Sequence, residues 1–254
     1  MKEFPELADI TSAAAALAGI AHETPLEASA TFSAMVGQPV YLKLENLQKT
    51  GSFKLRGAFN KIRLLSATEK AHGVIAASAG NHAQGVAYAA RQTGIRAVIV
   101  MPETAPLSKV SATRGYGAEV VLAGASYDEA YGRAKELSAA EGLTFVHAFD
   151  DPAVMAGQGT IGLEILRELP DVRAVIVPVG GGGLIAGVAK AVKSLAPQVK
   201  VIGVQAEGAD AMVRSKAADR LLQTPTAVTI ADGIAVKAPG RGTFEMLRQY
   251  LDQM

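Results

Sequence analysis

The sequence predicts an α/β protein with mostly parallel sheets flanked by helices. Short apolar runs rich in β-branched residues alternate with helical patterns along most of the 254 residues, as in parallel sheets joined by crossover helices. Glycine is frequent, at 26 residues, which suits many tight turns between strands and helices. The runs that predict strands are Val74–Ala77, Ala97–Met101, Glu119–Ala123, Thr144–Phe149, Ala174–Val179 and Val199–Gln205.

The N-terminal part predicts one helix and then extended chain. Asp9 or Thr11 can cap a first helix through the alanines, which Gly19 would end. Extended chain follows from Thr24, and Val40–Glu45 alternates apolar and polar residues, as a half-buried strand does.

Three later helices have recognisable ends or faces. Ser126 and Glu129 form a capping box, and Gly142 would stop that helix. The last predicted helix begins near Thr243 and runs out at Met254 with no strand after it. Another helix follows a run of four glycines, and its apolar stripe is Leu184, Ile185, Val188, Val192 and Leu195.

Composition excludes several classes of function. The formal net charge of +1 gives no field that would attract nucleic acid or an anionic membrane, and the absence of cysteine excludes thiolate chemistry and disulfides. Glu3 and Glu6 stand where a secretory signal needs a basic start, and the alanine-rich run 13–21 is too short to span a bilayer. We therefore expect a cytoplasmic enzyme with no membrane and no nucleic-acid partner.

A lysine at the start of a predicted helix is the first candidate for chemistry. Lys54 lies in the stretch 49–58, Lys-Thr-Gly-Ser-Phe-Lys-Leu-Arg-Gly-Ala, directly after a glycine-bearing turn. The positive end of a helix dipole disfavours a nearby cation, so an amine held there and shielded from water loses its proton more easily. Such an amine can act as a nucleophile. On this stretch alone, a solvated lysine on a basic turn is the alternative.

The second candidate is the turn Ser78–Gly85, between a predicted strand and a predicted helix. Ser, Gly and Asn at such a turn present several backbone N–H groups in one direction, which suits a carboxylate or a phosphate. The alternative is an ordinary N-cap formed by Asn81 or Ser78. His82, in the first turn, is expected to be an imidazole kept neutral by the helix dipole, and not a metal ligand, since no other histidine stands at metal-ligand spacing.

The third candidate is the run Gly180–Leu184, where a predicted buried strand ends and a helix begins. Four glycines let the backbone wrap closely around an anion while the helix N-terminus adds partial positive charge, so the run predicts a phosphate site. The same residues satisfy a relaxed dinucleotide fingerprint, with Glu207 about twenty residues on, so NAD is a rival ligand.

The three candidates together predict one cofactor. A lysine amine, a phosphate site and a carboxylate site are all used by a cofactor that carries a phosphate and an aldehyde and acts on an amino acid. That description fits pyridoxal 5'-phosphate, and NAD would leave Lys54 and the turn at Asn81 without a use.

The stretches 51–58, 78–85 and 180–184 resemble, in this order, the serine/threonine dehydratases (threonine ammonia-lyases), which are fold-type II pyridoxal-phosphate enzymes. Ala231–Val236 adds to the resemblance, which runs from the N-terminal helix to the last residue. It implies a two-domain fold similar to the β subunit of tryptophan synthase. Residues 1–72 and 148–254 would form the larger cofactor-binding domain, and residues 73–147 a smaller mobile domain.

The resemblance also implies a role for each site residue. Lys54 is the catalytic lysine that bonds the cofactor, Phe53 packs by the cofactor ring, and Asn81 bonds the ring hydroxyl. The substrate carboxylate would be held by Ser78, Ala79, Gly80, Asn81 and His82. The cofactor phosphate would be held by Gly180, Gly181, Gly182, Gly183 and Leu184.

Related families differ at these positions. Cysteine synthases normally follow the lysine with Asp-Arg and the asparagine with threonine, where this chain has Leu55-Arg56 and His82. Serine racemases have a serine as the second proton donor at the place of Ala79, and an alanine cannot move a proton. Their acidic metal site would fall on Gln205, Ala209 and Ala211, so no metal is expected.

The resemblance implies that the enzyme converts L-threonine, and L-serine as well, to 2-oxobutanoate or pyruvate and ammonia, a reaction used in isoleucine biosynthesis. A serine racemase or a β-replacement enzyme on the same cofactor is the alternative. Members of the family continue with a Ser-Gly-Gly-Asn segment that does not follow Met254, so we expect C-terminal truncation. An inactive cofactor-binding or assembly fragment is therefore the alternative of another class. A homo-oligomer, dimer or tetramer, is expected.

Overall fold

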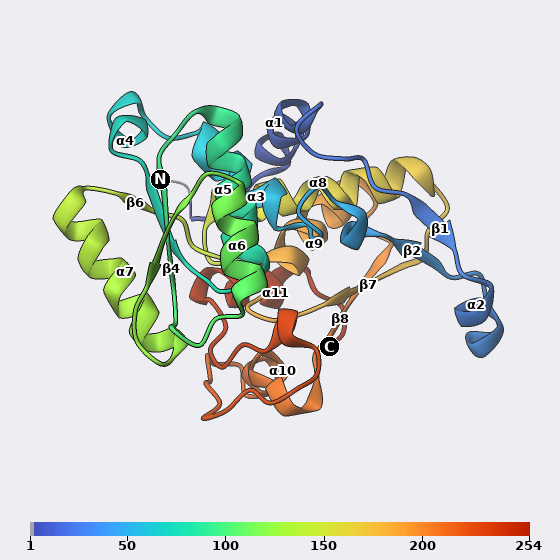
Figure 1. The fold of residues 1–254 in the computed structure, drawn as a ribbon. Coiled ribbons are helices and arrows are strands. Elements are labelled where there is room, and N and C mark those ends of the chain that lie inside the picture. The colour runs from blue at the N-terminus through green and yellow to red at the C-terminus, as the bar shows by residue number, and fades with distance from the viewer. Residues whose placement is uncertain (1–2) are drawn as a thin grey trace.

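A computed structural model describes residues 3–254 and confirms the α/β class (Figure 1). The middle of the chain forms a four-stranded parallel sheet in the order β5-β4-β3-β6. Its strands are β3 (Val74–Ala77), β4 (Ala97–Met101), β5 (Glu119–Leu122) and β6 (Thr144–Phe145). The two central strands are buried along their whole length, as continuous apolar runs predict for a sheet covered on both faces.

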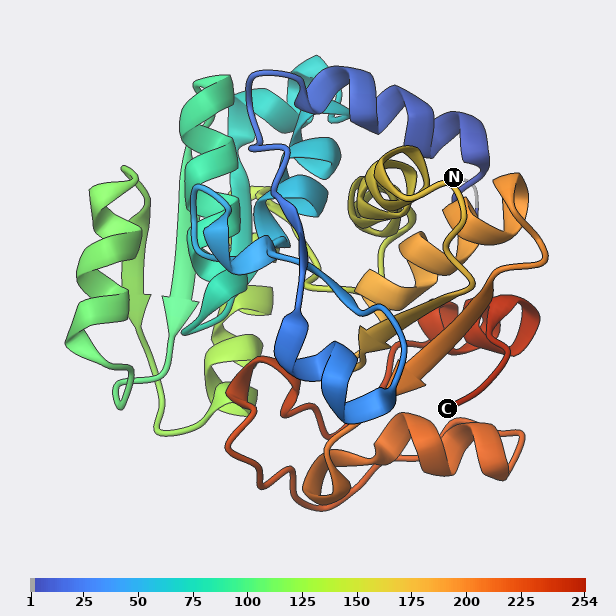
Figure 2. The same ribbon diagram turned by 90° about the vertical axis from the view of Figure 1, so that its right-hand side faces the viewer.

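Helices cover both faces of this sheet, which Figure 2 shows from the side. On one face α5 (Asn81–Thr93) and α6 (Leu107–Gly115) share a core with Val74 and Ile99. On the other face α7 (Tyr127–Glu141) packs through Ala130 and Ala134.

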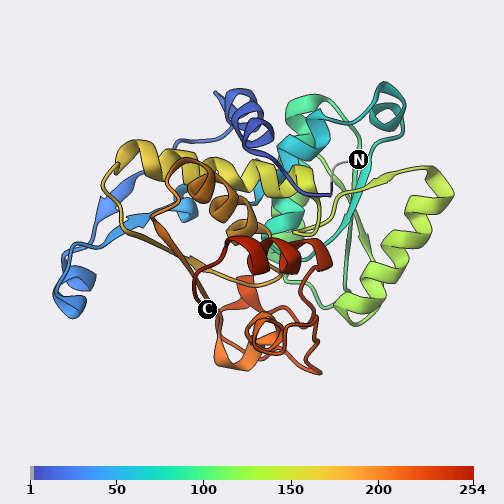
Figure 3. The ribbon, with the colours of Figure 1, turned by 180° about the vertical axis from the view of Figure 1, so that it is seen from behind.

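The second half of the chain contains a two-stranded parallel sheet, visible from behind in Figure 3. Its strands are β7 (Ala174–Pro178) and β8 (Lys200–Val204). The helix between them is α9 (Gly183–Leu195), which packs against both α8 (Pro152–Glu168) and α11 (Arg241–Tyr250). A second core joins these elements.

The N-terminal part wraps around both halves. After α1 (Leu7–Leu17), the strands β1 (Leu26–Ala28) and β2 (Tyr41–Lys43) pair antiparallel, with α2 (Ala30–Val36) between them at the right-hand edge of Figure 1. Helix α3 (Lys54–Arg63) follows. The other helices are α4 (Ala67–His72), α10 (Ala211–Ala217) and the short 3-10 helices Glu45–Leu47, Glu207–Ala209 and Asp232–Ile234.

Helix α3 lies at the centre of the molecule. Leu55, Phe59 and Ile62 are buried in the same core as strands β3 and β4. Helix α3 also packs against α8. This core therefore crosses residue 73, where the smaller domain is expected to begin.

The sequence predictions for the ends of three helices were wrong in part. The first helix begins at Leu7, and its Asp9 carboxylate accepts a hydrogen bond from the Glu6 N–H at 2.8 Å. Ser126 caps α7 as predicted, but the Glu129 carboxylate accepts from the N–H of Ala125 at 2.9 Å. Leu195 of the predicted apolar stripe is 53% exposed, because the stripe leaves the core in the last turn of α9.

Two further differences concern strands. The predicted strand Thr144–Phe149 ends at Phe145, and after one more hydrogen bond, from the Val146 N–H to the Ile75 carbonyl at 2.8 Å, the run leaves the sheet. The last helix begins at Arg241 and is followed by strand-like pairing, since Gln253 bridges Ile202 of β8 in parallel. Within residues 3–254, no helix combines the length and the apolar character needed to cross a bilayer.

Candidate active site

Lys54 is the first residue of α3, and its amine is buried. Its Nζ donates a hydrogen bond to the carbonyl oxygen of Ala148 at 2.7 Å and lies 5.4 Å from the centre of the Phe53 ring. Burial lowers the pKa of Lys54 from 10.5 to about 8. The predicted depression is therefore found, with loss of hydration as its cause. A measurable fraction of this amine is unprotonated near neutral pH.

The residues that follow β6 connect the predicted parts of the site. We call Val146–Asp150 the connecting segment. The carbonyl of Val146 accepts from His82 Nε2 at 2.9 Å, and that of Ala148 accepts from Lys54. Phe149 lies against the glycine run, since a Cβ added at Gly183 would stand 2.8 Å from the Phe149 Cα. Lys54, the turn Ser78–Gly85 and the run Gly180–Leu184 thus all contact the connecting segment.

His82 is a neutral histidine, as predicted. Its pKa is lowered to about 3, first by burial and then by the nearby charge of Lys54. Because a carbonyl can only accept, the Nε2 that faces Val146 carries the proton. Among the residues that the structure describes, no group of three or more His, Asp or Glu could hold a metal ion. Gln205, at the place of a racemase metal ligand, instead accepts from the N–H of Val213 at 2.9 Å.

The start of α5 has no side-chain cap. Gly80 is the N-cap residue, and its N–H donates to the Ser78 hydroxyl at 3.1 Å. The alternative of a cap formed by Asn81 or Ser78 is therefore wrong, and the first N–H groups of α5 are left for a ligand. Gly85 allows the helix to lie on α3, because a Cβ there would stand 2.9 Å from the Lys54 carbonyl carbon.

The glycine run forms a second uncapped helix start. Gly182 is the N-cap of α9 with a positive φ of 99°, which an L side chain rarely adopts. Gly180 packs on the 231–236 segment, since a Cβ there would stand 3.1 Å from Ile234 Cα. No side chain caps this helix, so its first N–H groups point to where an anion can bind. Leu184 is half-buried beside the second core.

Two buried hydroxyls in the turn that precedes Lys54 in the sequence have no hydrogen-bond partner. Within the described residues, Thr50 Oγ1 and Ser52 Oγ are the buried side-chain polar atoms without a hydrogen bond. A buried hydroxyl without a partner costs about 1–3 kcal/mol. Two such groups in the turn that leads into Lys54 fit a site that a ligand completes.

Sequence reasoning missed the ion cluster of Arg56, two residues after Lys54. Its guanidinium is 1% exposed, pairs with Glu45 at 2.8 Å and also binds Glu164. Burial alone would lower the pKa of Arg56, but the hydrogen bonds that it donates to Glu45 and Glu164 outweigh burial and raise the pKa. The cluster fixes the first turn of α3 to α8. A charged residue between apolar neighbours of a helix was the available signal.

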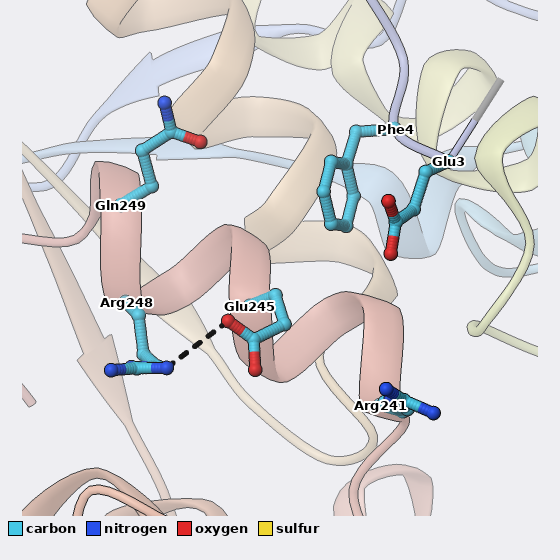
Figure 4. Close-up of a pocket in the computed structure, with 6 residues that line it drawn as sticks. All are labelled: Glu3, Phe4, Arg241, Glu245, Arg248 and Gln249. Atoms are coloured by element: carbon cyan, nitrogen blue, oxygen red, sulfur yellow. Dashed lines mark hydrogen bonds and ion pairs between the residues drawn. The ribbon is translucent and has the colours of Figure 1, made fainter.

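The surface pockets lie elsewhere. Figure 4 shows one of about 440 Å³ on the outer side of α11, where Arg248 pairs with Glu245 at 3.2 Å. A second pocket, of about 480 Å³, adjoins the ion pair of Lys61 and Asp151. Lys54 and the glycine run line neither of these two pockets. The geometry of Lys54 and the helix starts therefore defines the candidate site, and pocket size does not.

Comparison with known proteins decides the family. The family model described as "Pyridoxal-phosphate dependent enzyme" matches residues 17–254. Threonine deaminase isoform 2 from Solanum lycopersicum is 45% identical, with a TM-score of 0.93 over 98% of this chain and 73% of that one. The chain belongs to the serine/threonine dehydratase family of fold-type II pyridoxal-phosphate enzymes.

Two other similar proteins show which reaction types occur with this fold. An L-threonine ammonia-lyase of Thermotoga maritima is 56% identical over 98% of this chain, which spans 62% of that relative. The structure of maize serine racemase is 37% identical, with a TM-score of 0.95 over 98% of this chain and 75% of that one. The fold is thus shared by dehydratases and racemases, and reaction type must be argued from the site.

The described residues fit the family's cofactor. Pyridoxal 5'-phosphate needs an amine for its aldehyde and N–H groups for its phosphate, and Lys54 and the start of α9 supply them. A dinucleotide could use the same glycine run, and Glu207 does follow β8, but a dinucleotide has no use for a buried lysine amine. The family assignment therefore replaces the NAD alternative.

Lys54→Met should raise the free energy of unfolding of the cofactor-free protein at pH 7, by about 2–3 kcal/mol. The pKa of Lys54 is lower in the folded than in the unfolded chain, so folding at pH 7 buries a charged amine at a cost. The native amine loses its proton near pH 8, while the unfolded one keeps it to about 10.5. The increase in the free energy of unfolding of Lys54→Met over wild type should thus be full below pH 8 and shrink between pH 8 and 10.5. Urea unfolding at a series of pH values measures it.

Lys190→Met is the matched control for that experiment. Lys190 is also buried, but its Nζ pairs with Glu6 at 2.7 Å and contacts Tyr250 OH at 3.1 Å. Its removal should lower the free energy of unfolding at pH 7. A Lys54→Met gain that stays constant up to pH 10.5 would contradict the buried, depressed amine.

Gly183→Ala should destabilise the protein by about 1–3 kcal/mol and greatly weaken binding of pyridoxal phosphate. The new Cβ would meet the backbone of Phe149, so the glycine run must shift. Gly132→Ala is the control, because no heavy atom lies within 4 Å of a Cβ at Gly132 in α7. Thermal unfolding and a cofactor titration measure both effects, and normal cofactor binding by Gly183→Ala would refute the assigned role of the run.

Proposed function

We propose that the protein is a pyridoxal-phosphate-dependent ammonia-lyase that converts L-threonine, and L-serine as well, to 2-oxobutanoate or pyruvate and ammonia. The observation that carries the proposal is the buried Lys54 amine, with its pKa lowered to about 8, beside two uncapped helix starts in a chain of this family. The name of the relative from Thermotoga maritima supports it.

When bound, the cofactor supplies an aldehyde that bonds the substrate amine and a ring that accepts electrons. The glycine run Gly180–Gly183, with Leu184, would hold the phosphate through N–H groups at the start of α9. Phe53 would pack by the ring, and Asn81, which is exposed in the first turn of α5, would bond the ring hydroxyl.

The substrate carboxylate would be held by the turn Ser78–His82. The uncapped N–H groups of α5 are the donors, and the neutral His82 adds no competing charge. A substrate held by this turn would present its Cα to Lys54. The Lys54 amine, unprotonated in part near neutral pH, would take the Cα proton as the general base. Loss of the β-hydroxyl as water and hydrolytic release of ammonia complete the balance.

Ala79 disfavours racemisation, because its side chain holds no proton to deliver to the opposite face of Cα. The likeness to maize serine racemase makes racemisation the alternative on this cofactor, with β-replacement beside it. Chiral analysis of the products separates these reactions. Keto acid without D-amino acid supports the dehydratase, whereas D-serine without keto acid would overturn it.

We further propose that residues 73–147, which contain the four-stranded sheet, move as a smaller domain over a larger one formed by residues 1–72 and 148–254. We also propose that the protein is cytoplasmic and forms a homo-oligomer, either a dimer or a tetramer. Because the chain spans 62% of the Thermotoga relative, an inactive cofactor-binding or assembly fragment is the alternative of another class. A preparation that stays colourless with added pyridoxal phosphate would favour that alternative.

Lys54→Ala should abolish the visible absorbance of bound cofactor and lower 2-oxobutanoate formation from L-threonine by about a thousandfold or more. The variant lacks both the amine that bonds the aldehyde and the base for the Cα proton. Lys200→Ala, at the exposed first residue of β8, should leave both readouts unchanged. Absorbance spectra and a keto-acid assay measure the difference, and an unaltered visible band in Lys54→Ala would refute the role of Lys54.

A further inference from the structure

Thr243 lies in the first turn of α11, on the side that meets the glycine run. Its side chain is 0% exposed, and Oγ1 donates to the carbonyl oxygen of Gly181 at 2.6 Å. The N–H of Gly240 reaches the same carbonyl at 3.3 Å. A Cβ at Gly182 would stand 2.8 Å from Thr243 Cβ. The carbonyl of Gly181 is thus held from the side of α11.

The first turn of α11 is itself fixed by the connecting segment. The Asp150 carboxylate accepts from the N–H of Arg241 and from the N–H of Thr243, each at 3.0 Å. Figure 4 shows Arg241 and Glu245 on the outward face of the same helix, toward the surface pocket. Thr243 is therefore an inward contact whose position depends on Asp150.

Holding this carbonyl determines where a neighbouring N–H points. The carbonyl of Gly181 and the N–H of Gly182 belong to one planar peptide, and in a trans peptide they point in opposite directions. Both residues are glycines, so side chains place little restriction on rotation of that peptide plane. The hydrogen bond from Thr243 restricts it and keeps the Gly182 N–H turned away from Thr243.

We propose that Thr243 is a positioning residue for the cofactor phosphate: it fixes the Gly181–Gly182 peptide so that its N–H faces the bound anion. This inference rests on the proposed function, because it assumes that the glycine run holds the phosphate. It extends the site to α11, for which the sequence predicted no functional role, and it assigns Asp150 the task of placing that helix.

Thr243→Val, which keeps the shape and loses the hydroxyl, should weaken pyridoxal phosphate binding to the cofactor-free protein by about tenfold. The affinity for pyridoxal, which lacks the phosphate, should not change. Thr243→Ser keeps the donor and should restore the wild-type dissociation constant for pyridoxal phosphate. Absorbance titrations of each protein with each aldehyde supply the dissociation constants.

Thr113→Val is the matched control. Thr113 is also 0% exposed, and its Oγ1 donates to a single carbonyl, that of Lys109, at 2.9 Å in α6. This variant should lower the melting temperature without changing either dissociation constant. If Thr243→Val does not fold, Asp150→Asn removes one acceptor from the same turn and should weaken pyridoxal phosphate binding several-fold, again sparing pyridoxal.

Two results would overturn the inference. One is a Thr243→Val protein, or the Asp150→Asn protein in its place, that binds pyridoxal phosphate as wild type does. The other is an equal loss for pyridoxal phosphate and pyridoxal, which would show a general structural effect. If wild-type protein itself fails to bind pyridoxal phosphate, the proposed function falls and this inference with it, so the two failures are distinguishable.

Discussion

Burial of the Lys54 amine against the carbonyl of Ala148 is the constraint on which the rest of the site depends. An ammonium group without water is costly, so the protein lowers the pKa of Lys54 to about 8 and gives the amine one backbone acceptor. That acceptor exists only because the chain leaves the sheet after Phe145. The same path of the chain places the Val146 carbonyl within hydrogen-bond distance of His82 and packs Phe149 against the glycine run.

The charges around this amine are consistent with its role. His82 is kept neutral by burial and by Lys54, so one buried cation is not added to another. The two helix starts that face the site are uncapped by side chains, and their partial positive charge is free to act on anions brought by ligands. Arg56, by contrast, is fully paired with Glu45 and Glu164 and contributes rigidity to the first turn of α3.

The local parts of this structure could be predicted from the sequence, and the long-range ones could not. Strands β3 and β4, the strand-to-helix turn at the glycine run and the helix start at Lys54 depend on neighbours in the chain, and their predictions were confirmed. The run 144–149 reads as one strand because its residues favour extended chain. Its last part is instead held by His82 and Lys54, from 64 and 94 residues away.

The same limit applies to side chains that act at a distance. Nothing near Thr243 in the sequence indicates that its hydroxyl reaches Gly181, 62 residues earlier. The pairing of Arg56 with Glu164 spans 108 residues. The three motifs located Lys54 and both uncapped helix starts, but the residues that hold these parts in register lie outside the motifs and required the fold.

The central claim is that Lys54 is the amine that bonds the cofactor, and covalent trapping tests it most directly. The protein loaded with pyridoxal phosphate would be reduced with borohydride, digested and mapped by mass spectrometry. The account predicts one dominant phosphopyridoxyl adduct, on the peptide that contains Lys54. An adduct spread over exposed lysines, with Lys54 unmodified, would contradict it.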